Sequence, residues 1–379
     1  MFRTRSSLRA IACLIAVTFL AGAVFAQAPS ATLLVLAKSD NTVAIIDPAT
    51  LQALARLPAG PDPHEIIAST DGKLAFISNY GGSDSALNTI SVVDLVARKA
   101  LPPVDLGALR STHGLDFAGG KLYFTAETNK VIGRYDPATQ RVDWVLGTGQ
   151  DRTHMIAVAP SLDRIVTSNV NSGTISIIEQ ISASNFGPPP GGPAPGGPAP
   201  GAPGAGPGSA SPSGTPPGPQ PGQPRLTWEV TNVPAGRGAE GFDLSPDGKE
   251  IWAANARDAT VTIIDVATKK AVQTLPIPVK GANRLKFTPD GKRVLVSGLG
   301  ARSGDSSLVV IEASTRKEVK QLNLGGGAAG ILIAPDGARA YIAVSSADKI
   351  AVVDLKTLEV VGEINAGKQP DGMAWAVRK

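Results

Sequence analysis

The sequence predicts an all-β protein, first because one turn signal recurs along the chain. Its variants appear at intervals in the forties and include TDGKLAFI, AGGKLYFT, PSLDRIVT, PDGKEIWA, PDGKRVLV and PDGARAYI. Each turn is preceded by a short apolar strand pattern and followed by three more, of which the middle one ends in an acid, as in TVAIID and TISVVD. Seven acid-ending strands predict seven repeats. Four short, β-branched strands per repeat are typical of a propeller blade, so we expect a seven-bladed β-propeller.

The repeat also resembles a known family. The segment SPDGKEIWAANARDATVTIIDVATKKAVQTLPI and its six degenerate copies are similar to the YVTN family of seven-bladed β-propellers. The resemblance covers residues 31–379 apart from one insertion. The resemblance implies a propeller fold but says little about function, because a propeller is a scaffold that hosts many chemistries.

The two ends of the chain predict how the ring closes. The repeats begin with a second strand, TLLVLA, and finish with an innermost strand, GMAWAV. An unpaired inner edge would remain unless these two strands met. We therefore expect the C-terminal strand to complete the N-terminal blade.

Residues 1–26 have the pattern of a signal peptide. Arg3, Arg5 and Arg9 precede a short apolar run, and small residues surround a cleavage site after Ala26 or Ala28. The run is short for a bilayer span, so we expect no membrane span after cleavage and a periplasmic or secreted protein. The only cysteine, Cys13, lies in this leader, which leaves no thiolate ligand or nucleophile in the mature chain.

The net charge and the composition of the chain limit the kinds of partner and structure that we expect. The formal charge of +4 falls to +1 once the three leader arginines are subtracted, so the charge does not favour nucleic acid. Residues 186–224 are rich in proline and glycine and lack branched aliphatic side chains, which predicts a disordered insertion between the two outer strands of the fourth repeat. We expect a monomer.

The three histidines of the chain share one setting. Alignment of the innermost strands places seven residues at one equivalent position, where the chain enters the strand at one mouth of the channel: His64, His113, His154, Glu240, Asn283, Ala329 and Asp371. One interpretation is a solvated rim of polar residues. The other is an arc of imidazoles that binds an anionic ligand or a metal, with His64, His113 and His154 as ligands and Glu240 as a fourth. Neutral imidazoles suit a single divalent transition metal such as zinc, copper or iron.

A second ring of residues is expected around the first, where the second strands end. Together the two rings and a preceding arginine predict a ligand pocket at the mouth, formed by Asn79, Glu127, Asn169, Asn255, Asn283, Asp371 and Arg152. Arginine, histidine, asparagine and acid side chains in one mouth suit a small polar or acidic ligand.

Two functional classes remain open. The first is an exported binding or scaffold protein that takes a small polar ligand or a partner protein at the channel mouth, and many members of the resembled family look like non-catalytic scaffolds. The alternative is a metal-dependent hydrolase, lyase or oxidase, because related propellers include such enzymes. No catalytic residue is assigned: HEIIA lacks the second histidine of a zinc protease, GGGAAG precedes a strand, and no Gly-x-Ser-x-Gly elbow or phosphate loop occurs.

Overall fold

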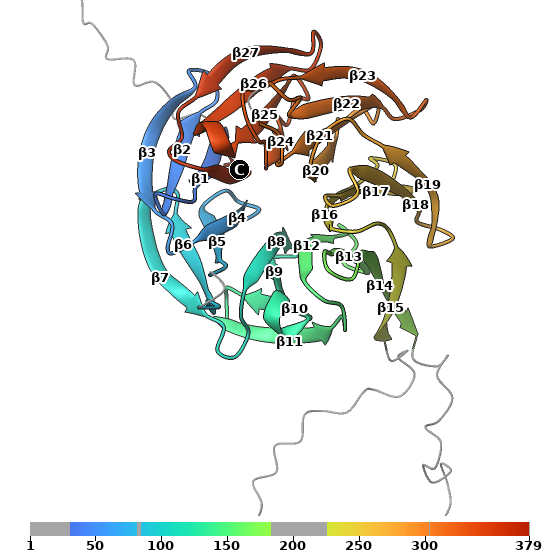
Figure 1. Ribbon diagram of the computed structural model, residues 1–379. Helices are drawn as coiled ribbons and strands as arrows, with labels where there is room; N and C mark the ends of the chain where they lie inside the picture. The colour runs from blue at the N-terminus through green and yellow to red at the C-terminus, as the bar shows by residue number, and fades with distance from the viewer. Residues whose placement is uncertain (1–30, 82–84, 183–225, 303, 379) are drawn as a thin grey trace, which may run out of the picture.

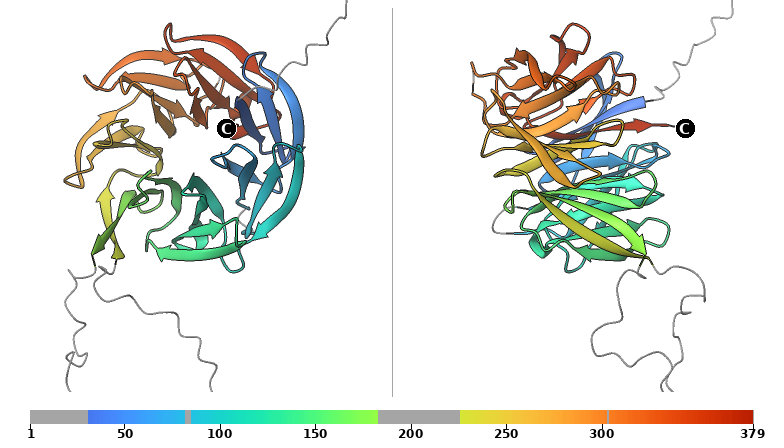
Figure 2. Two further views of the ribbon diagram at one scale, coloured as in Figure 1. Left: turned by 180° about the vertical axis from the view of Figure 1, so that it is seen from behind. Right: turned by 90° about the vertical axis from the view of Figure 1, so that its right-hand side faces the viewer.

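The computed structural model describes residues 31–81, 85–182, 226–302 and 304–378. In these residues seven four-stranded antiparallel sheets surround a central axis, which confirms the predicted seven-bladed β-propeller (Figure 1). Figure 2 shows the ring from behind and from the side. The helical elements in the described ranges are two single 3-10 turns, at Glu127–Asn129 and Ser345–Ala347, and neither approaches the length needed to cross a membrane.

Each blade runs from an inner strand at the channel to an outer strand at the rim. The strand orders are β28–β1–β2–β3, β4–β5–β6–β7, β8–β9–β10–β11, β12–β13–β14–β15, β16–β17–β18–β19, β20–β21–β22–β23 and β24–β25–β26–β27. The strands are β1 (Ala31–Ala37), β2 (Thr42–Asp47), β3 (Gln52–Pro58), β4 (Pro63–Ala68), β5 (Leu74–Asn79), β6 (Thr89–Asp94), β7 (Lys99–Asp105), β8 (Thr112–Ala118), β9 (Lys121–Ala126), β10 (Val131–Asp136), β11 (Arg141–Gly147), β12 (Thr153–Val158), β13 (Arg164–Asn169), β14 (Thr174–Ser182), β15 (Leu226–Pro234), β16 (Ala239–Leu244), β17 (Glu250–Asn255), β18 (Thr260–Asp265), β19 (Lys270–Pro276), β20 (Ala282–Phe287), β21 (Arg293–Gly298), β22 (Leu308–Glu312), β23 (Lys317–Leu322), β24 (Ile331–Ile333), β25 (Arg339–Val344), β26 (Lys349–Asp354), β27 (Glu359–Ile364) and β28 (Pro370–Val377).

One glycine and one aspartate determine the shape of the recurrent turn. In SPDGK, Gly248 has a φ of 70°, a left-handed conformation that glycine adopts without a steric penalty. The Asp247 carboxylate accepts a hydrogen bond from the backbone N–H of Lys249 at 3.1 Å. The turn thereby reverses the chain between β16 and β17 and sets the register of the inner hairpin.

The hydrophobic core lies between neighbouring blades. The second strands are nearly continuous apolar runs because both of their faces pack against an adjacent sheet. Trp252 on β17, for example, is fully buried and meets Phe287 of the next blade with ring centroids 5.5 Å apart. The blades therefore stabilise one another, and the inner strands are held at defined positions around the channel.

The C-terminal strand closes the ring as predicted. β28 pairs antiparallel with β1, with Trp375 opposite Leu33 and Met373 opposite Val35. The indole N–H of Trp375 also donates a hydrogen bond of 2.8 Å to the carbonyl oxygen of Ile333 in the preceding blade. The last strand therefore joins the first blade to the seventh.

The described residues on either side of the predicted insertion are two paired outer strands. β14 and β15 are the two outer strands of one blade, and they pair without interruption from Thr174 opposite Pro234 to Ser182 opposite Leu226. The predicted insertion, residues 186–224, and the predicted leader, residues 1–26, lie outside the described residues.

Candidate functional site

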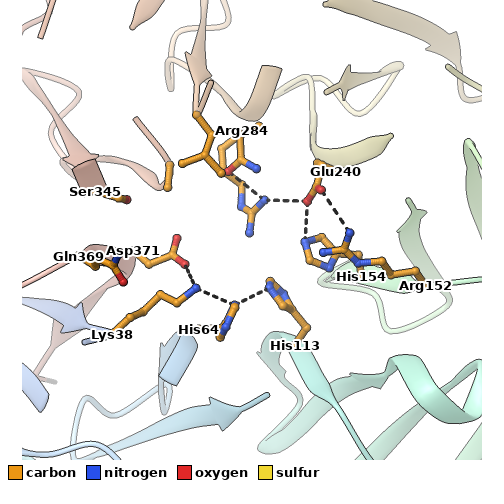
Figure 3. A pocket seen from close by; sticks show the side chains of 13 residues that line it. Lys38, His64, His113, Arg152, His154, Glu240, Arg284, Ser345, Gln369 and Asp371 are labelled. Atoms are coloured by element: carbon orange, nitrogen blue, oxygen red, sulfur yellow. Dashed lines mark hydrogen bonds and ion pairs between the residues drawn. The ribbon is translucent and has the colours of Figure 1, made fainter. Parts of the chain in front are cut away.

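The structure brings the three histidines together at one mouth of the channel. Each is the second residue of an inner strand, β4, β8 or β12, and these strands are neighbours in the ring. His64 Nδ1 lies 3.2 Å from His113 Nε2, and the rings of His113 and His154 have centroids 3.7 Å apart (Figure 3). The shared repeat position therefore becomes a continuous row of imidazoles.

These histidines border a cavity of about 330 Å³. Its lining residues are Lys38, His64, His113, Arg152, His154, Glu240, Asn283, Arg284, Leu299, Ala329, Ser345, Gln369 and Asp371. All four residues of the predicted histidine and Glu240 group are present, together with Arg152, Asn283 and Asp371 from the predicted ligand pocket. All but two of the lining residues, Leu299 and Ala329, are polar or charged, so the cavity suits a small polar molecule.

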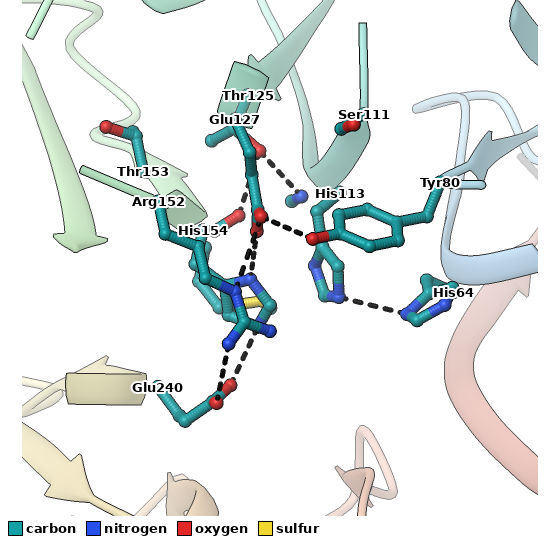
Figure 4. Close-up of polar contacts among 12 residues, drawn as sticks. His64, Tyr80, Ser111, His113, Thr125, Glu127, Arg152, Thr153, His154 and Glu240 are labelled. Atoms are coloured by element: carbon teal, nitrogen blue, oxygen red, sulfur yellow. Dashed lines mark hydrogen bonds and ion pairs between the residues drawn. The ribbon is translucent and has the colours of Figure 1, made fainter. Parts of the chain in front are cut away.

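His154 is held between two carboxylates. Its Nδ1 contacts Oε1 of Glu127, its Nε2 lies 2.9 Å from Oε2 of Glu240, and only 2% of the side chain is exposed (Figure 4). Tyr80 donates a 2.6 Å hydrogen bond to the second oxygen of Glu127, and burial together with this carboxylate raises the tyrosine pKa. A buried imidazole with an acceptor at each nitrogen carries a proton on both.

The electrostatics of this group follow from its contacts. Burial alone would lower the pKa of His154, but the carboxylates of Glu240 and Glu127 outweigh burial and raise it above its usual value. Burial likewise opposes ionisation of Glu240, yet His154, Arg284 and Arg152 bring the pKa of this carboxyl down to about 2. His154 is therefore a cation and Glu240 an anion at neutral pH.

His113 has the opposite character. Burial lowers its pKa well below the usual value, and the positive charges of His154, Arg284 and Lys38 lower it further. His64 Nε2 lies 3.2 Å from Asp62 Oδ1 and donates its proton there, so His64 Nδ1 accepts the proton of His113 Nε2. This tautomer leaves a bare lone pair on His113 Nδ1, which is buried and has no hydrogen-bond partner among the described residues.

Cationic side chains surround the rest of the cavity. Lys38 Nζ lies 3.4 Å from Asp371 Oδ2 and 3.4 Å from His64 Nδ1. Arg152 lies 3.4 Å from Glu127 and 3.7 Å from Glu240. These separations are longer than those of most N–H···O hydrogen bonds, so the cations are paired loosely with the acids of the cavity.

Arg284 and its partner Glu65 were not predicted from the sequence. Arg284 directly follows the predicted Asn283, and its Nη2 lies 2.7 Å from Oε1 of Glu65. A signal was present in the repeats, because four of the seven inner strands have glycine at the position of Arg284: Gly114, Gly241, Gly330 and Gly372. The arginine departs from this repeat pattern, and the departure was a signal that Arg284 has a special role at the channel.

Three predicted pocket residues have a different role. Asn79, Asn169 and Asn255 are buried at the ends of β5, β13 and β17 and do not line the cavity. Each amide Nδ2 donates to two hydroxyl groups on the next strand, at 2.8 to 3.0 Å: to Thr89 and Ser91, to Thr174 and Ser176, and to Thr260 and Thr262. They connect the second and third strands of a blade. Glu127 is at the same repeat position, but its carboxylate contacts Nδ1 of His154.

A metal could use part of the same group. His113, Glu127 and His154 each offer a ligand atom, and the three atoms lie within 4.8 Å of one another. Two of these residues belong to the predicted metal set. His154 has a carboxylate at each nitrogen, so it would have to release one of them to bind a metal ion.

Comparison with known proteins supports the fold. No protein-family model matches the chain, and no match appears among the curated proteins that were compared. A solved structure of a functionally unknown protein from Desulfotomaculum acetoxidans is similar with a TM-score of 0.65 and 13% identity, covering 89% of this chain and 98% of that one. Hydrazine synthase of Kuenenia stuttgartiensis is similar with a TM-score of 0.60 and 18% identity, covering 84% and 90%. At this identity the likeness shows the propeller architecture alone, and membership of the YVTN family stays a prediction.

Proposed function

We propose that this propeller is a binding protein that takes a small polar ligand into the cavity at the channel mouth. The observation that carries the proposal is the cavity itself, with positive and negative side chains facing one space. Its volume of about 330 Å³ lies at the lower end of the range for small-molecule sites.

Because the ion pairs of the cavity are loose, their charged groups remain able to bind a ligand. Lys38 and Asp371 are 3.4 Å apart, and Arg152 and Arg284 each lie 3.7 Å from Glu240. Pairs at these distances have not used their best hydrogen-bond geometry, so a ligand can offer shorter contacts to both signs of charge. The blade closed by β28 and the three successive blades that begin with β12, β16 and β20 supply these groups, which keeps them pre-positioned.

The test is a melting-temperature screen with small polar compounds, using a variant that obstructs the cavity. Leu299 lines the cavity but is 47% exposed, so Leu299→Trp fills space at the mouth without entering the core. We expect compounds that stabilise the natural protein to lose their effect in this variant. The matched control is Leu226→Trp on β15, where the leucine is 57% exposed and lies outside the cavity lining. Equal stabilisation of both variants would contradict the proposal.

A metal-dependent enzyme is the second candidate, and the histidine spacing favours it. Two ligand nitrogens bound to one metal at about 2.0–2.1 Å lie roughly 3 Å apart, close to the 3.2 Å between His64 Nδ1 and His113 Nε2. Metal analysis of the purified protein and melting with added zinc test this candidate. Bound metal, lost in His64→Ala and His113→Ala and on acidification below about pH 6.5, would support it.

We also propose that the protein is exported and acts as a monomer in the periplasm or outside the cell. The leader pattern in residues 1–26 supports the first part. Fractionation of cells and N-terminal sequencing test export, with cleavage expected after Ala26 or Ala28. Light scattering tests the monomer, and a mass of two chains would contradict it.

A further inference from the structure

Arg284 enters the channel because the neighbouring strand makes room for it. A Cβ atom at Gly241 of β16 would lie 2.9 Å from Cα and 3.0 Å from Cδ of Arg284. At Gly114, Gly330 and Gly372 a Cβ atom would lie between 2.3 and 2.5 Å from a carbonyl oxygen of the following inner strand. The inner strands therefore approach closely at this level of the channel, and the side chain of Arg284 is directed towards the axis (Figure 3).

The partner of Arg284 comes from across the ring. Glu65 lies on β4 and Arg284 on β20, and the inner strands β24 and β28 separate them along the shorter arc of the ring. Their 2.7 Å contact joins residues 219 positions apart in sequence, with side-chain exposures of 14% and 11%. This ion pair crosses the channel and fixes the direction of the guanidinium group.

The guanidinium group keeps hydrogen-bonding capacity in the cavity. It has five N–H donors, and its hydrogen bonds within the described residues are one to Glu65 and one of 3.3 Å to Asn283 Oδ1. Glu240 is 3.7 Å from Nη1, beyond direct hydrogen-bond distance. The planar fork of an arginine is complementary to the two oxygens of a carboxylate, so the remaining donors suit that group.

The surrounding charges favour an anion over a metal ion. The positive charges of His154, Arg284 and Lys38 lower the pKa of His113. A divalent cation beside His113 would be repelled by these charges, and the nearby acid, Glu127, already contacts His154. A carboxylate beside His113 would be attracted by Arg284 and Lys38. To bind it, Lys38 would give up only its loose pair with Asp371, and Arg284 only its loose pair with Glu240.

We propose that the ligand of the cavity is a small organic carboxylate, bound through the carboxylate by Arg284 with Lys38 beside it, and that Glu65 is the positioning residue of Arg284. This inference rests on the proposed function and names its ligand class. Glu65 acts by holding the guanidinium group and does not itself contact the ligand.

The experiment compares carboxylates with matched uncharged compounds. Succinate, citrate and acetate at millimolar concentration are tested against succinamide and acetamide by melting temperature and calorimetry. We expect stabilisation by one or more carboxylates and none by the amides. Arg284→Lys keeps the charge but loses the fork, so its affinity for the stabilising carboxylate should fall about tenfold or more. Inorganic phosphate is included as a second oxyanion, and tighter binding of phosphate than of every carboxylate would overturn the carboxylate assignment.

Two further variants separate binding from folding. Glu65→Gln keeps an oxygen acceptor but loses its charge, and we expect a fall of a few fold in affinity for the carboxylate. Glu65→Gln combined with Arg284→Gln removes both charges together, so no unpaired charge is buried, and this variant should fold but not bind. Arg316→Lys is the matched control, because Arg316 makes a similar 2.8 Å contact with Glu250 away from the cavity.

The outcomes distinguish this inference from the proposed function. Stabilisation by amides that Leu299→Trp abolishes would keep the binding function and overturn the carboxylate inference. Unchanged carboxylate affinity in Arg284→Lys would also overturn it. No stabilisation by any carboxylate, amide or other polar compound would overturn both.

Discussion

The imidazole rings of His113 and His154 lie with their centroids 3.7 Å apart, and one is neutral while the other is charged. The difference arises because carboxylates flank His154 at both nitrogens, whereas His113 is surrounded by cationic groups. Two charged rings at this distance would repel one another strongly in a buried site.

This contrast predicts separate titrations for the two residues. His154 should remain protonated above pH 6.5, and His113 should remain neutral well below that value. The raised pKa of His154 stabilises the fold below about pH 6.5, and this contribution is lost as pH rises through the raised value. The lowered pKa of His113 acts in the opposite direction, because the unfolded chain takes up the proton first as pH falls. NMR titration of the three imidazoles measures both, and two transitions near pH 6.5 would contradict the arrangement.

Glu240 should contribute to stability at neutral pH. Its pKa of about 2 lies below the ordinary value of 4.5, a difference worth on the order of 3 kcal/mol in the free energy of unfolding. The contribution is present above pH 4.5 and is lost as pH falls towards 2. Glu240→Gln should therefore destabilise the protein at pH 7 and progressively less below pH 4.5, as measured by urea unfolding. Glu229→Gln, at an exposed residue, is the control and should change stability little.

Asn255 should affect folding and leave ligand binding unchanged. Its amide donates to Thr260 at 3.0 Å and Thr262 at 2.9 Å inside one blade. Asn255→Ala removes both hydrogen bonds from a buried site, so we expect a loss of about 1–3 kcal/mol in the free energy of unfolding. Urea unfolding and calorimetry with a stabilising compound measure the two properties. Reduced affinity in the folded variant would restore Asn255 to the ligand pocket.

Removal of the closing strand should destabilise the whole propeller. Truncation before Asp371 leaves the inner edge of β1 unpaired and removes Met373 and Trp375 from their packing between blades. We expect a large fall in melting temperature. Truncation after Val377 keeps β28 and is the control, expected to melt close to the full chain. A truncation before Asp371 that melted like the full chain would contradict closure by β28.

Replacement of residues 186–224 by a short Gly/Ser linker should leave stability nearly unchanged. The described ends of this region, Ser182 and Leu226, are opposite one another on β14 and β15, so a short linker can connect them. The segment lacks branched aliphatic residues and so contributes little to a core. Thermal unfolding measures the effect, and a fall of several degrees would show that the segment packs against the propeller.

Sequence patterns predicted part of the site because they are repeated. The equivalent position of His64, His113 and His154 follows from the register of the inner strands, and the structure brings all three to one mouth. The same logic failed for Asn79, Asn169 and Asn255. A shared strand end does not reveal whether a side chain faces the channel or the next strand of its own blade.

By itself the sequence determined the repeats, their number, the closing strand and the histidine position. Local alternation, turn residues and repeat register encode these features, and each is visible among residues close together in the chain. Only the tertiary structure decided that Glu127 supports His154, that Arg284 meets Glu65 across the channel, and that His113 is neutral beside a charged His154. These relationships depend on the reach of side chains from different blades and on the sum of their charges, which ring closure alone brings into contact.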